Sequence, residues 1–152
     1  MEDLSLHVLD IVENSLRSNA SSVEIRLTED LEQDVLTLEI KDNGRGMSPD
    51  ALDRAADPFY TSKAGKKVGL GLALLAQAAR EADGNLDVSS SPDGGTTVRA
   101  VFRHSHPDRK PIGDMAATLR TLVRGNPDVD FFFDHREGPD VIHFDTREIK
   151  RS

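Results

Sequence analysis

Two neighbouring stretches in which apolar and polar side chains alternate limit the possible folds of this chain more than any other feature. Residues 21–30 and 34–42 both show the pattern, and a short polar connection separates them. Alternation with a period of two is typical of a strand that buries one face, so we predict a β-hairpin. The apolar members of the two stretches are Val23, Ile25, Leu27, Val35, Leu36, Leu38 and Ile40.

Helical segments are predicted before and after this hairpin. Residues 4–18 carry apolar side chains at a helical recurrence, and residues 70–83 are rich in alanine and leucine and stop at Gly84. Two further strands are predicted at 86–90 and 96–103, joined by a glycine-containing turn. This order predicts an α+β fold, a two-layer sandwich with helices on one face of a mixed sheet.

The segment after the second pair of strands is predicted to be an extension of this sandwich. A helix is expected at 113–124 and two strands at 128–135 and 140–145, the first with three consecutive phenylalanines that we place in the core. The segment is too small to be a separate domain on this evidence. We therefore expect one domain over residues 1–105 and a helix-plus-hairpin extension over residues 106–152. The hairpin could extend the sheet or pair with another protomer through an edge strand.

Composition excludes several classes of function. The chain contains no cysteine, which rules out disulfides, thiolate metal sites and cysteine nucleophiles. Its net charge of −8 repels phosphate backbones, so a nucleic-acid partner is not expected. No stretch approaches the roughly 20 apolar residues that cross a bilayer, and the acidic N-terminus does not resemble a signal peptide. We expect a cytoplasmic protein without a membrane partner.

The first predicted helix carries three polar residues that share one face. Asp10, Asn14 and Arg17 are spaced by four and by three positions. An amide oxygen is a ligand that Mg²⁺ accepts, a carboxylate can take a proton, and a guanidinium can neutralise phosphate oxygens. From these residues alone, an exposed polar helix face is the favoured interpretation.

A glycine-rich turn follows the hairpin. Asp42 ends the second strand, and Gly44 and Gly46 allow the backbone to turn sharply and approach a flat ligand. The carboxylate of Asp42 can accept a hydrogen bond from an exocyclic amino group such as that of adenine, and Met47 can pack on a purine. Alone, the sequence is also that of an ordinary turn.

Two more glycine-rich segments are candidates for binding. Gly69 and Gly71 precede a helix, where free backbone N–H groups and the helix dipole favour anions. The chain lacks the Walker A pattern, and Leu74 breaks the dinucleotide-binding pattern, so phosphate binding here requires another architecture. After Gly95, the hydroxyl of Thr96 is able to bond Asp42 or a bridging water.

The four segments together resemble the GHKL superfamily, which includes gyrase-type topoisomerases, heat-shock chaperones, sensor histidine kinases and mismatch-repair ATPases. The resemblance spans roughly residues 4–103. Its motifs are the N box DIVENSLRSNASSVEI, the glycine boxes DNGRGM and KKVGLGLALL, the lid segment DPFYTSK and the closing segment ADGNLDVSSSPDGGTTV. It implies the ATP-binding (Bergerat) sandwich of that superfamily, with ATP and Mg²⁺ as cofactors.

The resemblance also implies roles for individual residues. Asn14 corresponds to the Mg²⁺ ligand and Asp42 to the carboxylate that reads adenine, with Thr96 in the same contact. Arg17 stands where many histidine kinases have a lysine that contacts phosphate. The remaining implied nucleotide contacts are Gly44, Gly46, Met47, Phe59, Lys63, Lys67, Gly69, Leu70, Gly71 and Leu72.

Two departures from the family pattern affect the expected activity. Asp10 stands where hydrolytic and serine-kinase relatives have a catalytic Glu, and its shorter side chain moves the carboxylate by about 1.5 Å, enough to cost roughly 10²-fold in rate. The family's phospho-accepting helical hairpin does not precede the N box, and we read His7 as structural. We therefore expect a stand-alone domain that does not phosphorylate itself.

Three functions remain open on the sequence. The first, which we favour slightly, is a protein kinase that phosphorylates a separate partner on Ser/Thr or His. The second is a binding switch whose lid becomes ordered on ATP without fast chemistry. The third is a slow ATPase that forms a homodimer through the C-terminal extension.

Overall fold

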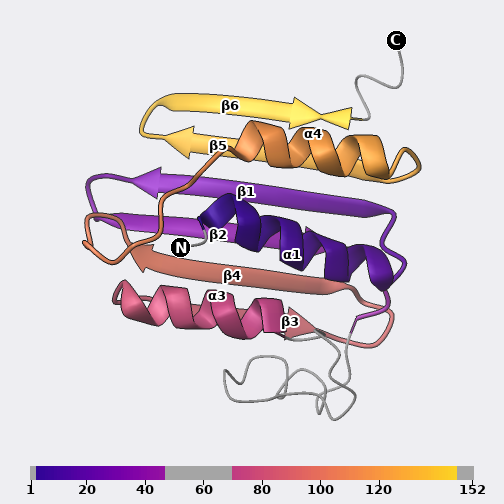
Figure 1. The fold of residues 1–152 in the computed structure, drawn as a ribbon, viewed down its shortest axis with the longest axis horizontal. Helices are drawn as coiled ribbons and strands as arrows, with labels where there is room; N and C mark the ends of the chain where they lie inside the picture. The colour runs from indigo at the N-terminus through magenta and orange to yellow at the C-terminus, as the bar shows by residue number, and fades with distance from the viewer. Residues whose placement is uncertain (1–2, 47–69, 147–152) are drawn as a thin grey trace.

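The computed structural model describes residues 3–46 and 70–146. These residues form a six-stranded sheet in the order β3-β4-β2-β1-β5-β6, and the helices lie on one face of it (Figure 1). The predicted α+β sandwich is confirmed. The helices are α1 (Leu4–Arg17), α3 (Leu70–Glu81) and α4 (Met115–Gly125), and the strands are β1 (Ser22–Asp30), β2 (Val35–Asp42), β3 (Asn85–Ser90), β4 (Thr96–Arg103), β5 (Asp130–Glu137) and β6 (Asp140–Asp145).

The central strands contain the hairpin that the sequence predicts, together with pairings between segments that are distant in the sequence. β1 and β2 form the expected antiparallel hairpin, with Ile25 opposite Ile40. β2 also pairs antiparallel with β4, which pairs with β3. β1 and β5 are parallel, so the sheet is mixed. The alternating apolar residues of β1 and β2 point to the helix-covered face; Val23, Ile25, Leu27 and Leu36 are fully buried there.

Helix α1 buries one stripe of apolar side chains against the sheet. Leu4, Val8, Ile11 and Val12 are 0–3% exposed, whereas Leu6 is 42% exposed. These buried positions recur at intervals of four and three, so the helix assignment is correct although one of its apolar residues faces solvent. Asp3 caps the helix, and its carboxylate accepts a hydrogen bond from the backbone N–H of Leu6 at 3.1 Å.

The C-terminal segment extends the same sheet. β5 pairs with β1 along its whole length, and β6 forms the outer edge. Phe131 and Phe133 are buried, as predicted, but Phe132 is only half-buried and contacts Arg26, because alternate residues of a strand point to opposite faces. The segment also holds the start of α1, because Leu4 N donates to the carbonyl oxygen of Pro111 at 2.8 Å.

A search of the described residues for a helix with the length and hydrophobicity of a transmembrane span found none.

Candidate functional site

The predicted site residues of the described segments converge where β2 ends and β4 begins. Asp42, the last residue of β2, lies directly opposite Thr96, the first residue of β4. The Asp42 carboxylate is held on both oxygens. Ser15 Oγ donates to Oδ2 at 2.6 Å, and the backbone N–H of Gly44 donates to Oδ1 at 2.9 Å. Its orientation is therefore fixed by α1 on one side and by the following turn on the other.

The polar face of α1 borders the same region. The guanidinium of Arg17 donates through Nη1 to Asn14 Oδ1 at 2.8 Å. Both residues lie in the last turn of the helix, next to Ser15. The amide oxygen that the resemblance assigns to a metal is therefore engaged by a cationic side chain of its own helix.

The beginning of α3 approaches this face. A Cβ built on Gly71, in the first turn of α3, would lie 3.5 Å from Asp10 Cβ and 3.7 Å from Asn14 Nδ2. The backbone N–H groups in the first turn of a helix have no intrahelical partner and attract anions. Asp10, Asn14 and Gly71 are thus neighbours, and a phosphate group in this region is an expectation from the glycine-rich sequence that precedes α3.

The glycines of the turn after β2 are required by packing against the turn before β4. Gly46 has φ +74°, and a Cβ there would lie 1.9 Å from the carbonyl oxygen of Ser91. Gly95 has φ +77°, and a Cβ there would lie 2.2 Å from the carbonyl oxygen of Asp42. Since neither position accepts a side chain, the two turns form one compact unit at this end of the sheet.

Thr96 has a different hydroxyl partner from the one considered on the sequence. Its Oγ1 lies 2.8 Å from Ser90 Oγ, across the β3–β4 pair. Ser90 Oγ also donates to the carbonyl oxygen of Gly95 at 3.0 Å. Thr96 therefore supports the glycine turn, and its position opposite Asp42 comes from the strand register.

Two polar residues of the site were missed by the sequence analysis. Ser15 interrupts the buried stripe of α1 with a hydroxyl, and no local pattern of the sequence specifies the strand end that it faces. Asn43 fastens the glycine turn to β1, since its Oδ1 accepts hydrogen bonds from the backbone N–H groups of Ser21 and Ser22 at 2.9 and 3.0 Å.

The remaining predicted site residues divide into two groups. Leu70 opens α3, and Leu72 is 6% exposed and belongs to the apolar core, so the Leu72 side chain supports the fold. Met47, Phe59, Lys63, Lys67 and Gly69 lie outside the described residues.

No group of three or more His, Asp or Glu side chains that could hold a metal is present in residues 3–46 and 70–146. The amide oxygen of Asn14 is one oxygen donor that the described residues offer in this region. Such a donor suits Mg²⁺, which prefers oxygen ligands and is commonly held by one or two protein groups together with substrate phosphates.

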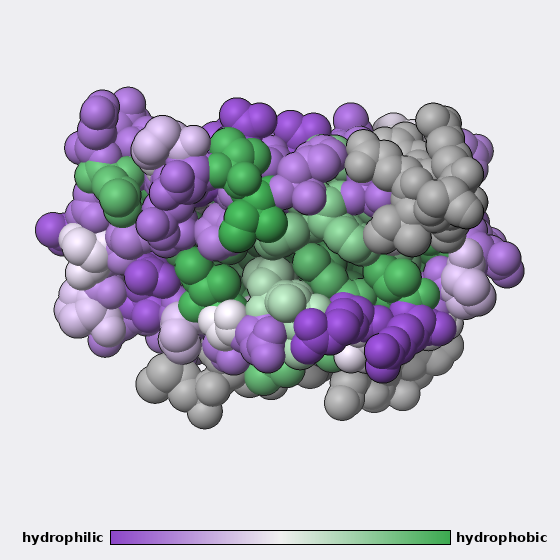
Figure 2. Space-filling model, turned by 90° about the horizontal axis from the view of Figure 1, so that it is seen from above, coloured by the Kyte–Doolittle hydropathy of each residue, from purple (hydrophilic) through white to green (hydrophobic). Residues whose placement is uncertain are grey.

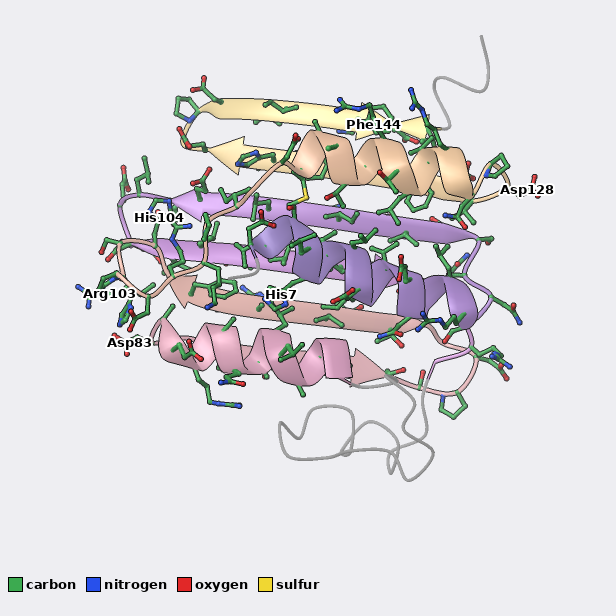
Figure 3. All side chains as sticks on the ribbon, in the orientation of Figure 1. His7, Asp83, Arg103, His104, Asp128 and Phe144 are labelled. Atoms are coloured by element: carbon green, nitrogen blue, oxygen red, sulfur yellow. The ribbon has the colours of Figure 1, made fainter. Side chains whose placement is uncertain are left out.

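A second polar cluster lies at the opposite end of the sheet, where Figure 3 shows His104. Glu29 is 6% exposed, and its two oxygens accept hydrogen bonds from His104 Nε2 at 2.9 Å and His135 Nε2 at 2.8 Å. Burial raises the pKa of Glu29, but the hydrogen bonds from His104 and His135 outweigh it, so the pKa is lowered overall. The carboxylate joins β1, the end of β4 and β5 in its ionised form.

Comparison with protein families gives a match over most of the chain. The family model described as "Histidine kinase-, DNA gyrase B-, and HSP90-like ATPase" matches residues 2–106. The match includes every candidate site residue named above and ends before α4.

Curated proteins similar to this chain include two bacterial sensor kinases. "Sensor histidine kinase YxdK" of Bacillus subtilis is 32% identical over 104 residues, which cover 65% of this chain and 32% of that protein. "Sensor protein kinase PilS" of Pseudomonas aeruginosa is 32% identical over 100 residues, which cover 62% of this chain and 19% of that protein. The chain thus matches about a third or less of the length of these two relatives.

Among solved structures, the "Aquifex aeolicus MutL ATPase domain complexed with ADP" has a similar fold. The TM-score is 0.54 at 18% sequence identity, and the alignment covers 95% of this chain and 64% of that one. At this identity the likeness concerns the fold, and it includes the C-terminal extension.

Proposed function

Because this chain belongs to the family of histidine kinase-, DNA gyrase B- and HSP90-like ATPases, we propose that it binds Mg-ATP beside Asp42 and Asn14 and transfers the γ-phosphate to a separate partner protein. The main observation in support of the ATP site is the fixed orientation of the Asp42 carboxylate, which Ser15 and the Gly44 backbone hold at the end of β2. Each carboxylate oxygen has a second acceptor position left for an incoming amino group.

Adenine recognition rests on Asp42 and its surroundings. A carboxylate can accept from the exocyclic N6 amino group, which adenine has and guanine lacks. The glycine turn packed against residues 91–95 would form the wall beside the base, with Gly44 and Gly46 in it. Met47 and Thr96 complete this part of the site by the family resemblance.

Phosphate and metal binding rest on α1 and the start of α3. Asn14 would hold Mg²⁺ through its amide oxygen, and the metal would neutralise charge on the phosphate oxygens. In the structure Arg17 donates to that oxygen. Charge repulsion between this guanidinium and a dication on the same oxygen favours movement of Arg17 away from Asn14, and an incoming phosphate is a stronger partner for the guanidinium. Lys63, Lys67, Gly69, Leu70 and Gly71 join the phosphate part by resemblance, and Phe59 joins the lid.

Asp10 is our candidate for the group that orients or deprotonates the acceptor. It lies on the same helical face as Asn14, one turn earlier, and next to the N-terminus of α3. A hydroxyl acceptor loses its proton as its oxygen bonds to the γ-phosphorus and ADP leaves. An imidazole acceptor would need less help from a base.

The names of the relatives favour a kinase over the other functions, since both curated relatives described above are sensor kinases. The ATP-dependent binding switch and the slow ATPase are the alternatives. One experiment separates the three. The purified chain is incubated with γ-labelled ATP and Mg²⁺, alone and with candidate acceptor proteins. A labelled acceptor supports the kinase, released phosphate alone supports the ATPase, and binding without turnover supports the switch.

Calorimetry tests the common premise of all three functions. Titration of the folded chain with ATP and Mg²⁺ should give heat of binding, with weaker binding of GTP. Absence of binding by folded protein would refute the ATP site and, with it, the kinase proposal.

We further propose that residues 1–105 form the nucleotide-binding domain and residues 106–152 its extension, since the family match ends at residue 106. A cytoplasmic location follows from the proposed use of ATP. We also propose homodimerisation through β6, which is the outer strand of the sheet in the described residues and exposes 53% of Val141 and 64% of Ile142. Light scattering on the chain and on a Val141→Lys variant tests it, since a charge on an edge strand opposes strand pairing.

A further inference from the structure

An apolar groove lies between α4 and the β5–β6 hairpin, far in sequence from the proposed nucleotide site. Its volume is about 460 Å³. Figure 2 views the molecule from the β6 side and shows an apolar hollow bordered by hydrophilic residues. The apolar lining comes from Met115, Leu119 and Val123 on α4 and from Phe133, Ile142 and Phe144 on the hairpin.

The groove exists because the sheet extends beyond its helices. In Figure 1, α3 lies over β3 and β4, α1 over the central strands and α4 over β5. Phe133 is paired with Phe144, and His135 with Ile142, so these side chains share the helix-side face of the two outer strands. Within residues 3–46 and 70–146, no helix covers β6, and Ile142 is 64% exposed.

The charge of the groove is opposite to that of the chain. Arg120 and Arg124 line it from consecutive turns of α4, both exposed, and none of the lining residues within 3–46 and 70–146 is acidic. The whole chain carries a net charge of −8. The third ionisable lining residue, His135, is engaged by the buried carboxylate of Glu29. The two guanidinium groups are therefore the charges that an occupant of the groove would meet.

We propose that this groove binds an amphipathic helix of a partner protein, with acidic residues flanking its apolar stripe. The partner helix would lie beside α4 over β6 as the next helix of the layer, where helices pack about 8–10 Å apart. Its apolar residues at spacings of three and four would fill the hollow. Carboxylates along the α4 side would pair with Arg120 and Arg124.

Charge complementarity argues against two occupants from the chain itself. Residues 147–152 contain Arg147, Lys150 and Arg151 and a single acid, Glu148. Their net positive charge would therefore be repelled by the positive charge of the groove. A second copy docked groove to groove would bring Arg120 and Arg124 against their own equivalents, because a two-fold interface presents the same patch from both sides.

The test uses two synthetic helical peptides with identical leucine positions, flanked by Glu in one and by Lys in the other. Fluorescence anisotropy with the full chain should show binding of the acidic peptide and at least tenfold weaker binding of the basic one. Added salt should weaken the acidic complex. The double variant Arg120→Glu, Arg124→Glu should reverse the preference, and Ile142→Lys should weaken both peptides. Arg99→Glu, an exposed charge reversal on the opposite sheet face, should leave binding unchanged.

Four results would overturn the proposal. The first is equal binding of the two peptides or no binding of either. The second is peptide binding only after deletion of residues 147–152, which would identify that segment as the occupant. The third is self-association that depends on Arg120 and Arg124, which would identify a second copy. The fourth is arginine-dependent binding of decanoate without binding of the acidic peptide, which would identify a small amphiphile. ATP binding is measured separately, so failure here leaves the proposed function standing.

Discussion

Ser15 Oγ donates a hydrogen bond of 2.6 Å to Asp42 Oδ2, joining the last turns of α1 to the end of β2. Ser15 is 5% exposed, so water does not replace this bond easily. The residue directly after the proposed metal ligand Asn14 thus fixes the carboxylate proposed to read adenine. The metal and base parts of the proposed site are coupled through one helix.

The first prediction concerns this hydrogen bond. Ser15→Ala should weaken ATP and adenosine binding roughly 10- to 150-fold, because a hydrogen bond to a charged group contributes about 1.5–3 kcal/mol. Calorimetry measures the affinity and thermal melting confirms folding. Ser5→Ala is the matched control, a buried serine at the other end of α1 whose hydroxyl bonds Asp3. Equal loss of affinity in both variants would indicate a general effect on the helix.

The second prediction concerns Arg17, which donates to Asn14 Oδ1. Arg17→Ala removes a cation from the proposed metal ligand and also a proposed phosphate contact. The Mg²⁺ concentration for half-maximal ATP binding should therefore fall, while ATP affinity at saturating Mg²⁺ becomes weaker. Asn14→Ala should abolish the Mg²⁺ dependence. If Arg17→Ala shifts neither quantity, the proposed exchange of Arg17 from Asn14 to phosphate is wrong.

The third prediction concerns Asp10. Asp10→Asn should lower phosphoryl transfer or hydrolysis about 10²-fold or more, with ATP affinity nearly unchanged, because a positioned base contributes 10²–10⁴-fold. Asp10→Glu extends the side chain by one methylene, to the Glu that hydrolytic relatives have at this position. It should raise the rate of ATP hydrolysis. Single-turnover assays with labelled ATP measure both variants. A parallel loss of binding in Asp10→Asn would count against a role as base.

The fourth prediction concerns pH. The pKa of Glu29 lies below its ordinary value of 4.5 in the folded protein. A carboxyl group with a lowered folded pKa stabilises the fold above the unfolded pKa, and this contribution disappears as pH falls through the folded pKa. Denaturation between about pH 3 and pH 7 should show stability falling below about pH 4.5. Glu29→Gln should be less stable at pH 7 by about 1.5–3 kcal/mol and show a smaller acid-induced loss.

Glu137 supplies a control of opposite sign for this pH measurement. It lies opposite Glu29 in the β1–β5 pair, and its hydrogen bond and charge interaction with Glu29 raise its pKa. Its ionised form is thus disfavoured by the fold, so Glu137→Gln should increase stability at pH 7. A decrease would contradict the assigned interaction between the two carboxyl groups.

The fifth prediction concerns the contact between the C-terminal segment and α1. Gly113 has φ +80°, and a Cβ there would lie 2.3 Å from the Asp3 carboxyl group. Gly113→Ala should destabilise the protein by about 1–3 kcal/mol, through backbone strain and disturbance of the helix cap. Gly125→Ala is the control, since no atom lies within 4 Å of its added Cβ and a helical alanine is tolerated. Urea denaturation compares the two.

The elements of the fold were predictable because their patterns are local. The alternating residues of β1 and β2 predict both strands and their hairpin, and each boundary falls within two residues of the expectation. The parallel pairing of β5 with β1 was not predicted, because Val23 and Phe131 are more than a hundred positions apart. A strand's pattern indicates which face is buried without identifying the neighbouring strand.

The candidate site also has one part that local sequence patterns predict and one part that they do not. The shared face of Asp10, Asn14 and Arg17 follows from helical spacing, and the hydrogen bond between Asn14 and Arg17 agrees with it. The role of Ser15 depends on where the end of β2 meets α1, which no local pattern specifies. The cluster of Glu29, His104 and His135 was missed for the same reason, since its members come from three distant segments.

The position of β1 between β2 and β5 bears on attempts to trim the protein. A fragment cut after β4 would leave the N–H and C=O groups of β1 without their β5 partners, along with the apolar side chains that Phe131 and Phe133 cover. Such a fragment would expose β1 as a long, unpaired edge strand, which can pair with strands of other molecules. We expect it to precipitate during purification, so biochemical work on the nucleotide site should keep β5 in place.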